Sequence, residues 1–118
     1  MLIRCLLVDD SEVFLSSART LLCQQGVTVV GTASQSEEAL RLAGALRPDV
    51  ILVDVTLGDE NGFDLARRLV ESNRGKAVIM ISARDESDYA DLIAESPAAG
   101  FLAKVELSAE GIRRNLAR

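Results

Sequence analysis

Five polar side chains stand at the ends of short apolar segments, and their types suit phosphoryl-transfer chemistry. They are the carboxylates of Asp9, Asp10 and Asp54, the hydroxyl of Ser82 and the ammonium group of Lys104. A carboxylate can act as a nucleophile that accepts a phosphoryl group. Carboxylates also bind Mg2+, which keeps water and phosphate oxygens in its remaining coordination positions. A lysine ammonium pairs with phosphoryl oxygens, and a hydroxyl can donate a hydrogen bond to one.

Each of these residues has an ordinary structural alternative when it is taken alone. Asp10 or Ser11 could cap a helix that begins there. Asp54 suits a turn, Ser82 suits a helix cap, and Lys104 suits a solvated surface. The joint placement favours one site, because functional groups in open α/β sheets gather at the carboxyl ends of the strands. Three carboxylates in one cleft repel one another. We therefore expect a divalent cation and the Lys104 ammonium to offset this repulsion.

Five short apolar runs have the length and the β-branched content of strands. Near-continuous apolar runs are typical of strands buried on both faces of a parallel sheet. The runs are Ile3–Val8, Val27–Ala33, Val50–Val53, Ala77–Ile81 and Gly100–Ala103. The longer stretches between them carry apolar residues at helical spacing. This alternation predicts one α/β domain over residues 1–118, with a five-stranded parallel sheet that is doubly wound as (βα)5 and flavodoxin-like.

Cap residues support the expected helix boundaries. Ser108 stands where the last helix should begin, and Gly26 stands where the first helix should end. Ser34 and Glu37 have the spacing of a capping box, but Ser36 is an equally good cap. The start of the second helix therefore stays open between these two alternatives.

Composition excludes several classes of protein. The 118 residues are 48% hydrophobic and 26% charged, as in an ordinary soluble domain. The net charge of −5 disfavours direct binding of nucleic acid, and the absence of histidine excludes a Ser-His-Asp triad and histidine-ligated zinc. Cys5 and Cys23 match no metal motif, so we expect two buried, reduced thiols, as in the cytoplasm. The apolar N-terminal run is interrupted by Arg4 and is too short to span a membrane.

Four motifs, in this order and at this spacing, resemble the receiver domains of two-component response regulators. They are LLVDDSE at Leu6–Glu12, PDVILVDVTLGDENG at Pro48–Gly62, VIMISA at Val78–Ala83 and GFLAK at Gly100–Lys104. The resemblance covers essentially the whole chain. Each motif alone is weak evidence, whereas the four together are specific to this family.

The resemblance implies a role for each residue of the expected site. Asp54 matches the phosphoacceptor of the family. Asp9 and Asp10 match the acidic pair that binds Mg2+, and the main-chain carbonyl of Thr56 matches the third protein ligand. Lys104 matches the lysine that contacts the phosphoryl group.

The resemblance also implies a switch. Ser82 matches the switch hydroxyl, and Phe101 matches the aromatic switch residue, at which phenylalanine is a known variant. In the family, phosphorylation draws the hydroxyl inward and turns the aromatic ring toward the core, which remodels the surface of the fourth helix, fifth strand and fifth helix. Thr56 and Arg84 match positions that modulate dephosphorylation, although Arg84 is alternatively a surface charge that pairs with a neighbour such as Asp85.

Two departures from the family pattern stand close to the expected site. Val105 follows Lys104 where the family usually has a cis-proline, and a cis bond is costly without proline, so a trans peptide is expected. Gly58 stands where the family often has a proline, which predicts a more mobile loop. Asp59 and Glu60 are expected to be solvated loop charges or, alternatively, to tune metal affinity.

The implied function is a phosphorylation-dependent signalling switch in the cytoplasm, without a membrane partner. A sensor histidine kinase or a phosphotransfer protein would supply the phosphoryl group, and homodimerisation on phosphorylation is a further expectation. The segment from Gly100 to Ala117 is similar to receivers that precede a helix-turn-helix domain of the NarL/LuxR type, which predicts a DNA-binding output domain outside this chain. The alternatives are a stand-alone receiver, an unphosphorylated pseudo-receiver that acts by protein interaction, and a metal-dependent phosphatase. We expect any catalysis to be limited to the domain's own phosphorylation and dephosphorylation, without turnover of a separate substrate.

Overall fold

The predicted five-stranded parallel sheet is confirmed. A computed structural model describes residues 2–72 and 76–117. Within these residues one sheet has the strand order β2-β1-β3-β6-β7, with all neighbouring strands parallel. The strands are β1 (Ile3–Val8), β2 (Val27–Ala33), β3 (Val50–Asp54), β6 (Ala77–Ser82) and β7 (Gly100–Ala103). β3 and β6 each extend one residue beyond the apolar run, so that Asp54 and Ser82 are the last residues of their strands.

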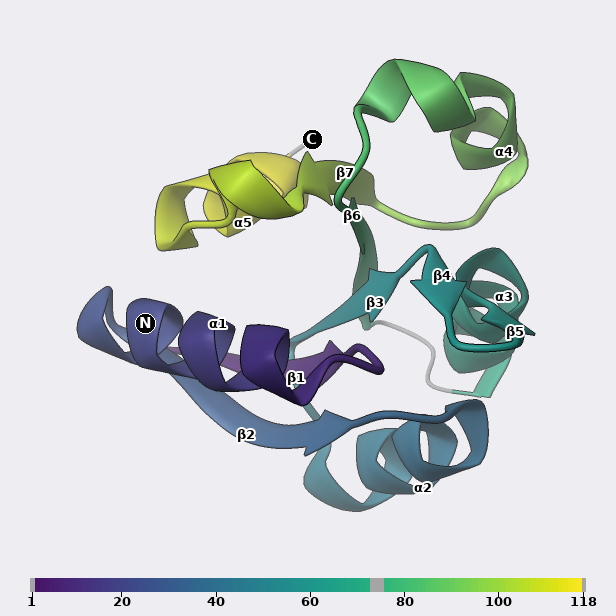
Figure 1. The fold of residues 1–118 in the computed structure, drawn as a ribbon. Coiled ribbons are helices and arrows are strands. Elements are labelled where there is room, and N and C mark those ends of the chain that lie inside the picture. Colours follow the sequence, from purple (N-terminus) through teal and green to yellow (C-terminus); the bar gives the residue numbers. More distant parts are fainter. Residues whose placement is uncertain (1, 73–75, 118) are drawn as a thin grey trace.

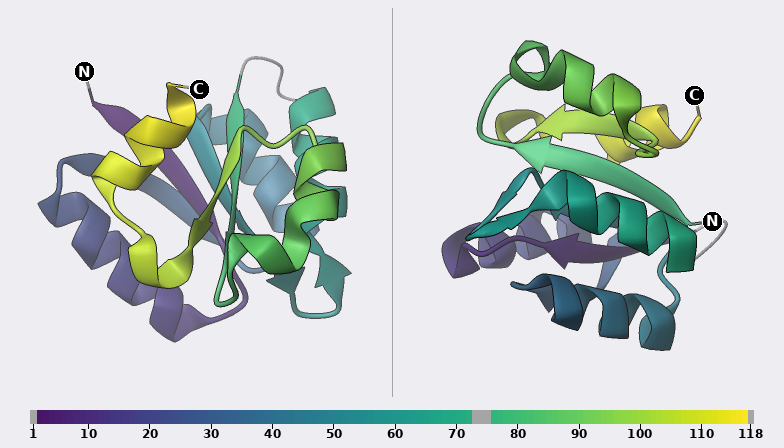
Figure 2. Two further views of the ribbon diagram at one scale, coloured as in Figure 1. Left: turned by 90° about the horizontal axis from the view of Figure 1, so that it is seen from above. Right: turned by 90° about the vertical axis from the view of Figure 1, so that its right-hand side faces the viewer.

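Helices cover both faces of the sheet, as expected for a doubly wound domain (Figure 1). α1 and α5 lie on one face, and α2, α3 and α4 lie on the other, an arrangement that the two turned views of Figure 2 also show. The α-helices are α1 (Glu12–Gln24), α2 (Ser36–Leu46), α3 (Gly62–Ser72), α4 (Ala90–Glu95) and α5 (Ala109–Leu116). Two short 3-10 turns, η1 (Glu86–Tyr89) and η2 (Lys104–Glu106), precede α4 and α5.

The strands separate two apolar layers, because successive side chains of a strand point to opposite faces. On β1, Leu6 and Val8 pack in the layer beneath α2 and α3, whereas Cys5 and Leu7 pack in the layer beneath α1 and α5. The central strand β3 alternates in the same way and is buried along its whole length. Burial on both faces is the reason that these strands read as continuous apolar runs.

Two of the predicted helix caps are confirmed. Ser11, rather than Asp10, is the N-cap of α1, and its hydroxyl accepts a hydrogen bond from the amide of Phe14. Ser108 caps α5 by accepting a hydrogen bond from the amide of Gly111 at 2.9 Å. Gly26 lies just beyond α1 with φ of +86°, a conformation that favours glycine.

Both predicted starts of α2 are wrong. Ser36 is the first residue of the helix rather than its cap, and its amide donates to the Glu60 carboxylate at 2.9 Å. The amide of Ser34 donates to Glu38 instead of forming the expected capping box with Glu37. A carboxylate distant in sequence thus occupies the position that a local serine was expected to fill, and local spacing cannot reveal such a partner.

A short hairpin that the sequence analysis does not predict follows Asp54. Its strands are β4 (Thr56–Leu57) and β5 (Glu60–Asn61), which pair in antiparallel fashion. Gly58 has φ of +60° at the first position of the two-residue turn, where hairpin turns of both primed types need a positive φ. The glycine that suggested a mobile loop therefore forms a defined turn beside the expected site.

The prediction of two buried thiols is right for Cys5 and wrong for Cys23. Cys5 lies on β1 in the core, where burial raises the pKa of its thiol to about 12. Cys23 lies on the exposed face of α1. Among the described residues, we find no helix with the length and apolar content that a membrane crossing requires.

The contact between β7 and α5 depends on the absence of a side chain at Gly100, since a methyl group there would overlap the amide of the buried Asn115. We expect Gly100→Ala to lower the free energy of unfolding by about 1–3 kcal/mol through overpacking. Urea denaturation measures the change, and Asn115→Ala in the same chain should recover part of it.

Gly44→Ala is the matched control for this prediction. Gly44 lies on the exposed side of α2, and a methyl group there would meet no atom within 4 Å. Alanine should stabilise this helix by about 0.5–1 kcal/mol. Equal effects of the two glycine substitutions would contradict the proposed packing between Gly100 and Asn115.

Candidate functional site

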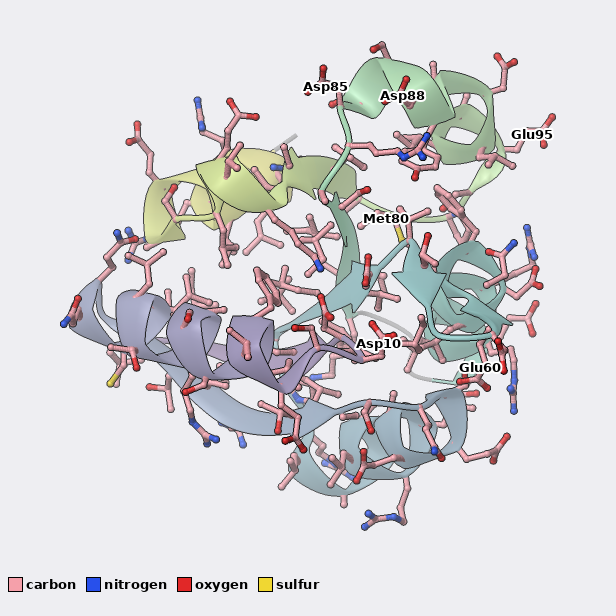
Figure 3. The ribbon with its side chains drawn as sticks, in the orientation of Figure 1. Asp10, Glu60, Met80, Asp85, Asp88 and Glu95 are labelled. Carbon is pink, nitrogen blue, oxygen red and sulfur yellow. The ribbon has the colours of Figure 1, made fainter. Side chains whose placement is uncertain are left out.

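Three carboxylates meet at the carboxyl edge of the sheet, as the sequence predicts. Asp9 and Asp10 follow β1, and Asp54 ends the neighbouring strand β3. One carboxylate oxygen of each residue lies within 4.8 Å of those of the other two. Asp9 is completely buried, Asp54 is 7% exposed, and Asp10 lies on the surface. The three therefore form a cluster that opens to solvent on the side of Asp10, the member of the cluster that Figure 3 labels.

Lys104 reaches this cluster from β7, on the far side of β6. Its Nζ atom lies 2.6 Å from Asp9 Oδ2 and 3.5 Å from Asp54 Oδ2. The peptide bond between Lys104 and Val105 is trans, as expected without proline, and the ammonium group nevertheless reaches both carboxylates. The departure at Val105 therefore does not remove the lysine from the site.

The environment of Asp54 disfavours its ionised form. Burial, and then the negative charge of Asp9, raise the pKa of Asp54 to about 6, against the opposing effects of Lys104 and of the Thr56 amide. Burial pushes the pKa of Lys104 down, but the hydrogen bond to Asp9 and the attraction of both carboxylates outweigh it, so the net direction is upward. The lysine stays charged. Its charge alone does not offset the effects of burial and of Asp9 on the carboxylate of Asp54.

An additional cation would fit this cluster. Asp9 Oδ2 is buried, and its partner among the described residues is the Lys104 ammonium at 2.6 Å, which it shares with Asp54. Asp9 Oδ1, by contrast, accepts a hydrogen bond from the amide of Ser11 at 2.8 Å. Oxygen ligands from one or two carboxylates, together with water, are what Mg2+ prefers. The donor set of Asp9, Asp10 and Asp54 is therefore of the right chemistry for that ion.

The residues after Asp54 hold its carboxylate and its backbone in place. The Thr56 amide donates to Asp54 Oδ1 at 3.3 Å, and the β4–β5 hairpin fixes the direction in which the chain leaves the strand. A methyl group on Gly62 would overlap the Asp54 carbonyl oxygen, so glycine allows α3 to begin directly against the end of β3. The assignment of the Thr56 carbonyl as a metal ligand stays a prediction.

The two expected switch residues are both buried. Ser82 ends β6, and its hydroxyl accepts a hydrogen bond from the Arg84 amide at 3.0 Å. Phe101 is 6% exposed and contacts Tyr89 of η1, with ring centroids 6.3 Å apart. Tyr89 in turn contacts Phe63 of α3 at the same centroid distance. Phe101 is thus already turned inward, and Tyr89 links it to α3.

Arg84 and the acids around it lie on the surface. The Arg84 side chain is exposed, and the ion pairs of the described residues include none between it and a neighbouring acid such as Asp85. Asp85, Asp88 and Glu95 point away from the sheet on the η1–α4 segment (Figure 3). The role of Arg84 in dephosphorylation stays a prediction.

Two residues near the site have roles that the sequence analysis missed. Glu60 was expected to be a solvated charge or to tune metal affinity, but its carboxylate caps α2 through the amide of Ser36. Phe14 was not considered at all, and its ring lies beneath the Lys104 ammonium, with Nζ 4.4 Å from the ring centroid. An aromatic residue in the first turn of a helix gives no signal of such a contact, because the partner comes from the other end of the chain.

The fold and this acidic, lysine-bearing edge define the protein as a doubly wound α/β domain with a charged cluster at the carboxyl ends of its strands, and comparison with known proteins identifies the family. The model of the response regulator receiver domain matches residues 5–114. The chain therefore belongs to the receiver domain family of two-component response regulators, whose members act in phosphorylation-dependent signalling.

Known relatives agree with this assignment. The chain is 32% identical to the response regulator GacA of Pseudomonas viridiflava over 104 residues. These residues cover 87% of this chain and 49% of GacA. The receiver domain of the putative response regulator NarL from Mycobacterium tuberculosis has a TM-score of 0.84 and 29% identity, over 98% of each chain. The chain spans about half the length of the curated relatives that it matches.

A third similar structure contains a modified residue and bound molecules. The structure of a response regulator protein from Burkholderia pseudomallei contains a phosphorylated aspartic acid, a calcium ion and citrate. It has a TM-score of 0.82 and 29% identity, over 97% of this chain and 66% of that one.

The raised pKa of Asp54 predicts that its carboxylate destabilises the metal-free fold. Unfolded Asp54 ionises near pH 4 and folded Asp54 near pH 6. The destabilisation is therefore absent below about pH 4, where the carboxyl group is protonated, and fully present above about pH 7. With allowance for solvent screening, Asp54→Asn should raise the free energy of unfolding by about 1–2 kcal/mol near neutral pH. Urea denaturation in EDTA at both pH values measures the gain, which should vanish near pH 4.

Asp59→Asn is the control for this charge effect. Asp59 is exposed in the turn of the neighbouring hairpin, and its removal changes the net charge by the same amount. Its effect on stability should be close to zero at both pH values. A gain for Asp54→Asn that is independent of pH would show that the carboxylate is not the cause.

Proposed function

We propose that Asp54 is the phosphoryl acceptor of this receiver domain. The observation that supports this best is the convergence of Asp9, Asp54 and Lys104 from three separate strands, with the ammonium within 3.5 Å of both carboxylates. Asp54 is the member of the cluster at the end of the central strand, and its position matches the phosphoacceptor of the family. The phosphorylated aspartic acid of the Burkholderia relative is consistent with this assignment.

The residues of the site supply the parts of a phosphoryl-transfer reaction. An oxygen of the Asp54 carboxylate attacks the phosphorus of the donor, and the bond from phosphorus to the donor nitrogen or oxygen breaks. Lys104 holds one phosphoryl oxygen by its positive charge, and the Ser82 hydroxyl donates a hydrogen bond to another. In dephosphorylation, water attacks phosphorus, the bond to the carboxylate oxygen breaks, and inorganic phosphate leaves.

Asp9, Asp10 and Asp54 are proposed to hold Mg2+, together with the main-chain carbonyl of Thr56. When bound, Mg2+ would neutralise negative charge on the transferring group and its acceptor. Two observations support this proposal: Lys104 is the shared counter-charge of Asp9 and Asp54, and burial together with the charge of Asp9 raises the pKa of Asp54. Asp10, which lies at the surface, gives the cluster a ligand on the open side.

The proposed readout of phosphorylation runs from Ser82 to Phe101. The Ser82 hydroxyl accepts a hydrogen bond from Arg84, and its own proton stays available for a phosphoryl oxygen. Because Phe101 is already buried, its part in the switch is to shift against Tyr89 rather than to enter from solvent. The surface that changes would be that of η1, α4, β7 and α5.

The wider setting is also a proposal. Response regulators are phosphorylated by sensor histidine kinases, and we propose such a kinase or a phosphotransfer protein as the donor for Asp54. A cytoplasmic location and homodimerisation on phosphorylation follow from the same family. The chain spans about half of its curated relatives, one of which is the transcriptional regulatory protein LiaR of Bacillus subtilis. This supports a DNA-binding output domain that lies outside these residues.

Phosphorylation by acetyl phosphate with Mg2+ tests the acceptor. We expect the wild-type chain to gain a slower phosphate-affinity gel band that Asp54→Ala abolishes, because Asp54 occupies the position of the family's phosphoacceptor. Asp59→Ala, which removes an exposed acid nearby, should keep the band. Persistent labelling of Asp54→Ala would overturn the assignment, and an unlabelled wild-type chain, with a phosphorylated kinase as donor too, would favour the pseudo-receiver.

Calorimetric titration with Mg2+ tests the metal ligands separately from phosphorylation. Asp10→Ala should weaken binding by at least about tenfold, since even the loss of an outer-shell partner costs a metal site about ten- to a hundredfold. Asp10 is exposed, so its removal should leave the stability of the fold nearly unchanged. Unchanged Mg2+ affinity in Asp10→Ala would remove this residue from the proposed site.

A further inference from the structure

The Lys104 ammonium lies between two carboxylates and one aromatic ring. Its Nζ atom is 2.6 Å from Asp9 Oδ2, 3.5 Å from Asp54 Oδ2 and 4.4 Å from the centroid of the Phe14 ring. A cation this close to the face of an aromatic ring is attracted by the ring quadrupole. The lysine side chain is only 19% exposed, so water screens this attraction weakly.

Phe14 is itself held in place by the residues that hold Asp9. The amide of Ser11 donates to Asp9 Oδ1 at 2.8 Å, and the amide of Phe14 donates to the Ser11 hydroxyl at 3.2 Å. The ring of Phe14 then contacts Lys104, which returns to the other oxygen of Asp9. These four residues therefore form a closed ring of interactions between the start of α1 and the end of β7.

The backbone around Lys104 offers little other restraint on its position. Lys104 opens the short 3-10 turn η2, in which no residue is buried, and the next residue, Val105, is 92% exposed. A lysine side chain has four flexible carbon–carbon bonds, and a freely rotating chain would bring its charge to the phosphoryl position only part of the time. The contact with the Phe14 ring, whose centroid lies 4.4 Å from Nζ, further restricts that rotation.

We propose that Phe14 is a positioning residue for phosphoryl transfer, whose ring face holds the Lys104 ammonium beside Asp9 and Asp54. This inference rests on the proposed function of Asp54 as the acceptor. Phe14 does not touch the phosphoryl group and acts through Lys104 alone. Cation–π contacts correspond to factors of about two to five at exposed sites and about thirty when fully desolvated. For this partly buried pair, loss of the ring should slow phosphorylation about three- to tenfold.

Fluorinated phenylalanines test the role of the ring charge without changing the shape of the side chain much. Replacing Phe14 by mono-, di- and trifluorophenylalanine withdraws electrons from the ring face in steps. We expect the rate of phosphorylation by acetyl phosphate at saturating Mg2+ to fall stepwise with each fluorine. The same series at Phe63, which contacts Tyr89 on the other face of the sheet, should show no trend. A flat series at Phe14 would overturn the inference.

Natural substitutions supply the complementary comparison. Phe14→Leu keeps an apolar side chain but removes the ring, and it should slow phosphorylation about three- to tenfold. Phe14→Tyr keeps the ring and should restore most of the rate. Urea denaturation of both variants shows whether the fold is intact, and equal rates for the leucine and tyrosine variants at equal stability would count against the ring.

A measurement without phosphorylation separates the inference from the proposed function. In the metal-free protein, a ring beneath the ammonium should shift the Lys104 ε-methylene proton resonances upfield, and Phe14→Leu should abolish that shift. If the wild-type chain is not labelled but this shift is present, the proposed function fails and the contact stands. If labelling occurs while the lysine resonances are unshifted, the function stands and the role of Phe14 is refuted.

Discussion

The structure depends on one electrostatic constraint, which is that the carboxylates of Asp9 and Asp54 are buried together at the edge of the sheet. Their repulsion is relieved by a single ammonium group, that of Lys104. Buried charges are tolerated only when they are paired, so the strands β1, β3 and β7, which end at or directly before these residues, must hold a fixed order and register. Lys104 comes from the edge strand β7 and passes the end of β6 to reach β3 and β1. Parallel pairing brings all four strand ends to one side, which makes this possible.

The same constraint explains why the sheet and the acidic site could be predicted from the sequence. Strands buried on both faces must be apolar along their whole length, and the first polar residue then marks the carboxyl end. Asp9 follows Val8 in this way, and Lys104 follows Ala103. At Asp54 and Ser82 the polar residue is still part of the strand, because the backbone pairing continues while the side chain has reached the edge.

The features that could not be predicted are those that depend on partners distant in the sequence. The carboxylate that accepts a hydrogen bond from the first amide of α2 is that of Glu60, and the residue beneath Lys104 is Phe14; neither contact has a local spacing that would reveal it. Cys23 was misjudged for a related reason, because an apolar helical pattern does not show which side of α1 faces the sheet. Local rules worked where the partner was within one turn, as at Ser11 and Ser108.

The distribution of buried residues indicates which part of the fold can respond when Asp54 is modified. The η1–α4 segment contains no buried residue and is linked to the core through Tyr89, which lies between Phe63 and Phe101. Segments with few buried contacts open at the lowest free-energy cost. The sheet is packed on both faces, and its close-packed interior resists deformation. A new charge at Asp54 that pulls on Ser82 would therefore displace this segment first, with Phe101 moving against Tyr89 inside an intact core.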